Sequence, residues 1–151
     1  MLVVESPAEL RAWVNRELGP STWVTVTQQM IDAFADVTGD HQWIHTDKGR
    51  AQRELPKGRT IAQGYLILSL LPRMQLDLWE IHGVGKAINY GAERLRFINP
   101  VSADSRVRLR VLVKSVETMQ NAVRLLTVST LEMENEVKPA LVIENINLLF
   151  A

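Results

Sequence analysis

The chain has 151 residues, of which 46% are hydrophobic and 23% are charged, and its 17 basic residues balance its 17 acidic ones. This length and composition are typical of one globular domain, and a neutral chain is a poor candidate for nonspecific nucleic-acid binding, which depends on neutralising phosphates. The lack of cysteine excludes disulfides, thiolate catalysis and thiolate-ligated zinc, and it fits a cytoplasmic protein.

Targeting signals do not stand out in the sequence. The N-terminal stretch MLVVESPAEL carries Glu5 early and has no basic segment, so it does not resemble a signal peptide. The longest apolar run, YLILSLLP, is far shorter than the ~20 residues that a membrane-spanning helix needs. We therefore expect a cytoplasmic protein with no membrane partner and no nucleic-acid partner.

The first third of the chain predicts two helices and a short strand. Residues 5–17 form a short amphipathic pattern, and TWVTV at 22–26 is typical of a strand. An apolar stripe then indicates a helix through about Val37, which Thr27 caps and Gly39 ends. Polar residues that follow this glycine are expected to lie in a turn.

The middle of the chain predicts a buried helix after a polar loop. Residues 46–59 are polar and read as a loop with at most one helical turn. A helix is predicted over 60–81, capped by Thr60. Its first half is apolar nearly all round, which is typical of a helix buried on most sides, and Pro72 is expected to kink or break it.

The rest of the chain predicts an antiparallel sheet. The glycine-rich stretch 82–93 reads as a loop, and strand patterns follow at 94–97, 107–114, 123–131 and 140–150. Consecutive strands with short links favour antiparallel pairing. Because a sheet must bury one face, the apolar helix is the natural element to cover it. The fold class is therefore α+β, with one antiparallel sheet around a long central hydrophobic helix.

The stretch GDHQWIH holds an acid and an imidazole that can work together. Asp40 and His45 have the spacing D-x4-H, and a turn can bring both side chains to one water molecule, which they could deprotonate and later reprotonate. The spacing alone is weak, because such pairs also arise by chance. His41 and His45 also have the spacing of a zinc-binding helix, but Gln42 stands where that motif needs a glutamate base, so no metal site is expected.

Three sequence segments, which follow one another in the chain, favour the interpretation of Asp40 and His45 as an acid–base pair. FADVTGDHQWIH, TIAQGYLILSLLPRM and RLRFINPV resemble motifs of the MaoC-like dehydratases, the (R)-specific enoyl-CoA hydratase family, and GDHQWIH with AINYG is most similar to its NodN-like branch. The resemblance spans roughly 22–150. It implies a single hotdog domain over 1–151, with the short N-terminal helix at about 5–17, and a homodimer.

The resemblance also implies roles for particular residues. Asp40 and His45 match the catalytic pair, which would activate the water that adds to C3 of a trans-2-enoyl thioester. Gly64 matches the glycine whose backbone N–H, at the positive end of the central helix, would bind the thioester oxygen. No metal or redox cofactor is implied, and coenzyme A enters only as part of the substrate.

Further residues of the resembling segments are expected to bind substrate. Gln42 and Trp43 replace the asparagine and proline of the family motif, and Gln63 replaces the histidine before Gly64. Gln42 would fix the loop as an amide, and Trp43 would pack against the acyl pocket. The other expected substrate-binding residues are Tyr65, Ser69, Asn89, Tyr90 and Arg94.

Basic residues on the predicted strands have two interpretations. Alternation makes Arg94, Arg96, Arg108, Arg110 and Lys114 the solvated face of a sheet, and any of them could instead bind coenzyme A phosphates. Lys57 and Arg59, just before the central helix, are further candidates, and the sequence does not choose among them.

The predicted function is (R)-specific hydration of trans-2-enoyl-CoA, or the reverse dehydration of a 3-hydroxyacyl thioester, on coenzyme A or an acyl carrier. Two alternatives remain open. One is an acyl-CoA thioesterase on the same fold, in which water attacks the carbonyl carbon. The other is a protein that holds an acyl or polyketide-like chain without turnover.

Overall fold

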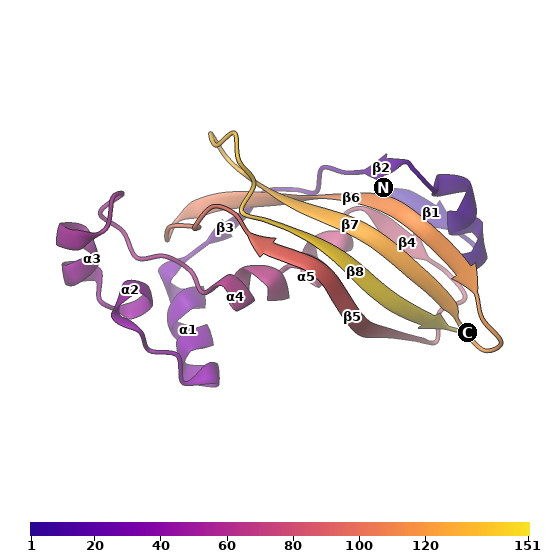
Figure 1. Ribbon diagram of the computed structural model, residues 1–151, viewed down its shortest axis with the longest axis horizontal. Coiled ribbons are helices and arrows are strands. Elements are labelled where there is room, and N and C mark those ends of the chain that lie inside the picture. The colour runs from indigo at the N-terminus through magenta and orange to yellow at the C-terminus, as the bar shows by residue number, and fades with distance from the viewer.

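A six-stranded antiparallel sheet dominates the molecule. The computed structural model describes residues 1–151. The strands of the sheet follow the order β2-β6-β7-β8-β5, and β3 pairs with β6 beyond β2 (Figure 1). Their bounds are Glu17–Leu18 for β2, Val24–Val26 for β3, Lys86–Phe97 for β5, Ser105–Thr118 for β6, Val123–Met133 for β7 and Leu141–Phe150 for β8. The predicted antiparallel sheet is confirmed.

Alternation along the strands sets the two faces of the sheet. On β6 and β7, every second residue is buried, from Val107 to Val113 and from Val123 to Met133. These side chains form most of the core, while the residues between them carry the charged outer surface. The inner face is the one that the helices cover.

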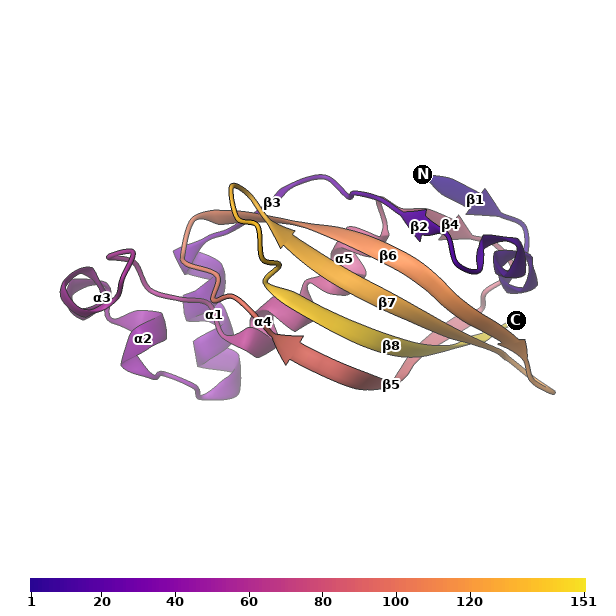
Figure 2. The same ribbon diagram turned by 45° about the horizontal axis from the view of Figure 1, so that its top comes forward.

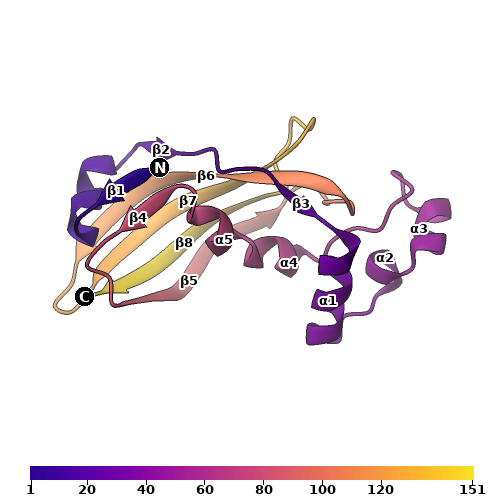
Figure 3. The ribbon, with the colours of Figure 1, turned by 180° about the vertical axis from the view of Figure 1, so that it is seen from behind.

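The element that covers the inner face is two short helices and not one long one. Figure 3 shows α4 (Gly64–Ser69) and α5 (Leu71–Gln75) lying end to end across the concave side of the sheet. The break falls at Leu70, two residues before Pro72, whose ring cannot continue a helix without losing a hydrogen bond. The predicted break is confirmed, but the predicted helix over 60–81 is too long at both ends.

Each end of that helix prediction fails for a local reason. Thr60 caps no helix, because its hydroxyl donates to the Gln28 side chain and the helix begins four residues later. After α5 the chain extends into β4 (Trp79–Ile81), which pairs in parallel with the N-terminal strand β1 (Leu2–Val4). Residues 79–81 therefore form a strand, because pairing with the distant strand β1 outweighs the local apolar pattern that predicts a helix.

The other differences lie at β5 and at the N-terminus. β5 begins at Lys86, within the stretch predicted as a loop, and its two register shifts, near Tyr90 and Arg94, disrupt the alternation that marks a strand. The expected helix at 5–17 is a shorter 3₁₀ helix, η1 (Pro7–Trp13).

Three helices gather beyond one end of the sheet (Figure 1). They are α1 (Gln28–Thr38), α2 (Trp43–Thr46) and α3 (Lys48–Glu54). As predicted, Thr27 caps α1 by accepting from the Met30 N–H, and Gly39 ends it in the left-handed conformation. α3 occupies half of the predicted loop 46–59. None of the helices combines the length and apolarity needed to cross a bilayer.

Candidate active site

His45 is a buried imidazole held in one orientation. It lies on the one-turn helix α2, with 9% of its side chain exposed. Its Nδ1 lies 2.6 Å from the Ile61 carbonyl oxygen. Because a carbonyl can only accept, Nδ1 carries the proton, and Nε2 of the neutral ring is left as an unprotonated acceptor. The backbone itself is fixed, since the Ile61 N–H donates to the Ile44 carbonyl oxygen.

Asp40 lies beside that free nitrogen. The left-handed turn at Gly39 redirects the chain after α1 and places the Asp40 carboxylate oxygen Oδ2 3.8 Å from His45 Nε2. This separation is too long for a hydrogen bond, but one oxygen about 2.8 Å from each acceptor fits between them. The Asp40 side chain is 52% exposed, so the pair lies where a buried imidazole meets solvent.

Gly64 and His45 line the same cavity. This cavity, called here the reaction cavity, has a volume of about 290 Å³ and an apolar lining that includes Ile67, Phe97 and Val101. Gly64 is the first residue of α4, so its N–H has no partner within the helix. A Cβ added at this position would lie 3.1 Å from three carbons of the Phe97 ring, which explains why the position holds a glycine.

Gln63 immediately precedes Gly64 in the chain but does not line the reaction cavity. Its side chain is buried, and its Nε2 donates to the Ile31 carbonyl oxygen at 3.2 Å. Its Oε1 has no hydrogen-bond partner. The residue that replaces the family histidine therefore links α4 to α1, so that it positions the start of α4.

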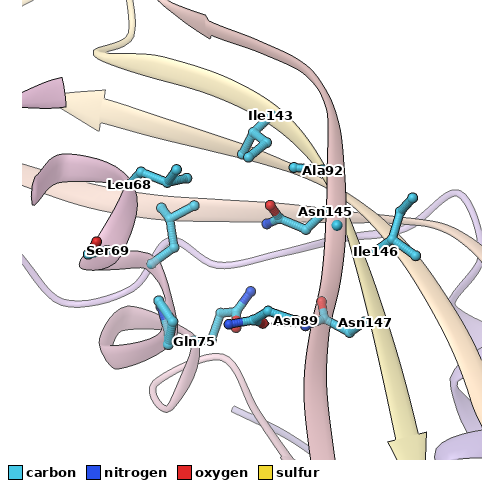
Figure 4. A pocket seen from close by; sticks show the side chains of 12 residues that line it. Leu68, Ser69, Gln75, Asn89, Ala92, Ile143, Asn145, Ile146 and Asn147 are labelled. Carbon is cyan, nitrogen blue, oxygen red and sulfur yellow. Dashed lines mark hydrogen bonds between the residues drawn. The ribbon is translucent and has the colours of Figure 1, made fainter. Parts of the chain in front are cut away.

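A second cavity lies farther along the same helical segment. This cavity, called here the distal cavity, has a volume of about 310 Å³ and lies between α4–α5 and the strands β5 and β8 (Figure 4). Two predicted substrate-binding residues, Ser69 and Asn89, line it together with Gln75, Asn145 and Asn147. The predicted residues are thus divided between two cavities.

The remaining predicted substrate-binding residues line neither cavity. Gln42 is exposed and shapes the turn through its carbonyl oxygen, which accepts from the His45 N–H. The Trp43 ring is covered by the Arg50 guanidinium, 4.0 Å from its centroid. Tyr65 packs edge-to-face on Phe97. Tyr90 and Arg94 are exposed at the two irregular positions of β5.

Most of the strand cations are paired with acids on the outer face of the sheet. Glu132 accepts from both Arg108 and Arg110, and Glu144 accepts from Lys114. Burial raises the pKa of Glu132, and the hydrogen bonds from the two guanidinium groups outweigh it, so the pKa is lowered overall. Lys57 pairs with Glu136 and Arg59 donates to the Ala103 carbonyl oxygen. This arrangement fits the solvated-face interpretation.

Four side chains that line the two cavities are not predicted from the sequence. Phe97 lies inside the segment RLRFINPV, and only the contact with Gly64 shows its role. Gln75 follows the helix break. Asn145 and Asn147 interrupt the inward apolar alternation of β8, and this interruption is a signal that the sequence does contain.

Comparison with known proteins identifies the relatives of this chain. The MaoC like domain matches residues 10–135. The chain is 47% identical over 147 residues to 3-hydroxyacyl-thioester dehydratase Z of Mycobacterium tuberculosis (strain ATCC 25618 / H37Rv), which covers 97% of both chains. It is 43% identical over 138 residues to nodulation protein N of Rhizobium leguminosarum bv. viciae, covering 90% of this chain and 86% of that protein.

A solved structure gives the same result for the fold. The MaoC-like dehydratase from Rhodospirillum rubrum superposes with a TM-score of 0.72 at 18% identity, covering 91% of this chain and 92% of the other. The fold and the family predicted from the sequence are both confirmed, and the chain belongs to the MaoC-like dehydratase family.

Proposed function

We propose that the protein catalyses the (R)-specific hydration of trans-2-enoyl thioesters and the reverse dehydration of 3-hydroxyacyl thioesters. The observation that carries this proposal is the fixed tautomer of His45. Its Nδ1–H is committed to the Ile61 carbonyl, so the basic Nε2 faces Asp40 across 3.8 Å. Two acceptors at this separation can hold both hydrogens of one water molecule.

The reaction then follows from the positions of the two acceptors. Water donates one hydrogen to His45 Nε2 and the other to the Asp40 carboxylate, which leaves its oxygen lone pairs free to attack C3. As the O–C3 bond forms, one water proton passes to the pair, and the C2=C3 electrons move toward the thioester carbonyl. The pair then returns a proton to C2, so that one water molecule has been added across the double bond.

Gly64 is the donor proposed for the thioester oxygen. Its N–H has no partner within α4, and the residue lines a largely apolar cavity, where a hydrogen bond to a developing enolate is stronger than in water. α4 has only six residues, so the backbone donor supplies this stabilisation and a long helix dipole does not.

The relatives support the substrate class. The relative with 47% identity is a 3-hydroxyacyl-thioester dehydratase, and the match covers nearly the whole of both chains. The addition of water transfers no electrons, so the proposed reaction uses no redox cofactor, and coenzyme A or an acyl carrier enters with the substrate. We expect this chemistry to take place in the cytoplasm, where acyl thioesters form.

A homodimer is part of the proposal. β5 is an edge strand of the sheet (Figure 2). Eleven of its twelve residues are exposed. Among them are Ile88, Tyr90 and Phe97, and Ile98 continues the apolar strip. An exposed edge with apolar side chains needs cover. A second copy paired along β5 would supply that cover next to both cavities.

Crotonyl-CoA tests the function directly. We expect the purified protein to remove the ultraviolet absorbance of the enoyl thioester without releasing a thiol, and to form the (R)-3-hydroxyacyl product as read by an (R)-specific dehydrogenase. Release of free coenzyme A, trapped by a thiol reagent, would identify a thioesterase instead. Tight acyl-CoA binding without turnover would identify a carrier of acyl chains.

A further inference from the structure

The inner face of the sheet contains a polar strip where its neighbours are apolar. Along β8 the inward positions are Leu141, Ile143, Asn145, Asn147 and Leu149. In register with the two asparagines, β7 places Thr127 opposite Asn145 and Leu125 opposite Asn147. Asn145 and Asn147 thus replace the aliphatic side chains that a core of this kind otherwise holds.

The strip continues onto both neighbouring strands. The Asn147 side chain donates to Asn89 Oδ1 at 2.7 Å on β5, and the Asn145 side chain donates to Ser129 Oγ at 3.0 Å on β7. Thr127 and Ser129 are fully buried, and the Thr127 hydroxyl has no hydrogen-bond partner. Polar groups are costly in a core unless something pairs with them.

The amides of this strip face the distal cavity. Asn89, Asn145 and Asn147 form its sheet wall, and Ser69 and Gln75 lie on the helical wall opposite (Figure 4). Each asparagine that donates within the strip keeps a second N–H and its own carbonyl oxygen for other partners. None of the twelve lining residues is charged. The cavity therefore suits a neutral group that both donates and accepts.

The reaction cavity and the distal cavity are lined by successive parts of the α4–α5 segment. Gly64 and Ile67 line the reaction cavity, and Leu68, Leu71 and Gln75 line the distal cavity. Gly64, Leu68, Leu71 and Gln75 are spaced by three or four residues, and Ile67 lies one turn after Gly64, so the two cavities adjoin neighbouring parts of the same α4–α5 segment. From Gly64 to Gln75 the helical rise is on the order of 15 Å, which a medium-length acyl chain can span.

We propose that the acyl chain accepted by this protein carries a hydroxyl or keto oxygen in its distal part, which the amides of the distal cavity bind. This inference rests on the proposed function, since it takes the thioester to lie at Gly64. An unsubstituted alkyl chain would displace water from the amides without replacing its hydrogen bonds. A cavity of this kind therefore binds such a chain less tightly than one that carries an oxygen.

The pantetheine arm of coenzyme A is the other neutral polar segment of the substrate. It fits the distal cavity less well, because the arm must lead to a diphosphate, and the cavity wall offers no lysine or arginine to meet one. Ordered water alone is the remaining alternative occupant. The experiment separates all three.

The test measures binding of saturated thioesters, which do not turn over. Dodecanoyl-CoA is compared by calorimetry with analogues that carry one keto oxygen at successive positions along the distal half of the chain. We expect at least one analogue to bind about tenfold more tightly than dodecanoyl-CoA. Asn147→Leu and Gln75→Leu should each abolish that preference. Asn121→Leu makes the same change in the exposed β6–β7 turn and should retain it.

Each other result overturns the inference. Equal affinities across the panel would indicate a cavity that holds only water. Weaker binding of coenzyme A itself by Asn147→Leu would place the pantetheine arm there. Crotonyl-CoA hydration by the wild-type protein reports on the proposed function separately. An active hydratase without a keto preference refutes the inference alone, and a keto preference without turnover refutes the function alone.

Discussion

The reaction cavity and the distal cavity lie along the same short helical segment, yet they hold their polar groups in different ways. At the reaction cavity, two of the polar groups belong to the backbone: the Ile61 carbonyl oxygen, which accepts from His45 Nδ1, and the N–H of the lining residue Gly64. At the distal cavity, the polar groups are side-chain amides. The proposed acid–base site therefore depends on the path of the backbone, whereas the proposed chain selectivity depends on side chains that substitution can change.

The largest effect is expected at the reaction cavity. Asp40→Asn replaces the carboxylate by a neutral amide that cannot take a proton, and His45→Ala removes the imidazole acceptor, so we expect hydration of crotonyl-CoA to fall by about 10³-fold or more in each variant. His41→Ala is the matched control, because His41 is an exposed neighbour whose closest acid is Asp36 at 3.7 Å. Equal losses in all three variants would show that the turn, and not the pair, is what matters.

A smaller loss is expected from crowding Gly64. The added methyl of Gly64→Ala would lie 3.1 Å from the Phe97 ring, so the ring or the start of α4 must move. We expect about a 10- to 100-fold loss of kcat/KM, because a displaced donor meets the thioester oxygen poorly. Gly49→Ala on α3 is the control, since its methyl makes only ordinary contacts. Adding Phe97→Leu to Gly64→Ala should restore part of the activity.

Two substitutions on β7, next to the asparagines of the distal cavity, should change the free energy of unfolding in opposite directions. Thr127→Val removes a fully buried, unpartnered hydroxyl, and we expect the free energy of unfolding to rise by about 1 kcal/mol. Ser129→Ala, two residues along the same strand, removes the acceptor of the Asn145 side chain and should lower it by a similar amount. Denaturant unfolding gives both values. Two changes of the same sign would contradict the assigned pairing.

The smallest effect is expected far from both cavities, where His82 joins the ends of β1 and β4. Hydrogen bonds from the ring to Glu5 and Glu80, in that order, raise the pKa of His82 above its ordinary value of 6.5. A raised pKa in the folded state adds stability below the ordinary value and loses it as the pH rises through the folded value. Wild-type Tm should therefore fall slightly between about pH 6 and about pH 8, and His82→Gln should flatten that decline without changing hydration of crotonyl-CoA.

Local patterns predicted the elements that depend on local forces. The cap at Thr27, the end of α1 at Gly39 and the break near Pro72 follow from single residues, and the structure has all three. The apolar alternation of β6 and β7 likewise marks the buried face. Each of these features depends on residues that are close together in the sequence.

The remaining features depend on partners far away in sequence. β4 is a strand because β1 pairs with it, and β5 is a strand although its irregular positions hide the alternation. The sequence indicated Asp40 and His45, but the tautomer that makes His45 a base depends on Ile61, sixteen residues later. The shared cavity of Asn145, Asn147 and Gln75 cannot be predicted from the sequence, because it depends on how the sheet packs against α5.

The interruption at Leu70 divides the covering segment into two short helices that are held by different parts of the molecule. α4 is anchored to α1 through the buried Gln63 amide, whereas α5 packs on the sheet at β6. A substitution on α5 can therefore change the space that the distal cavity offers to an acyl chain, while the position of the Gly64 N–H stays the same. Relatives with different tail preferences could arise by changes on α5 and β8 alone, without rebuilding the catalytic turn.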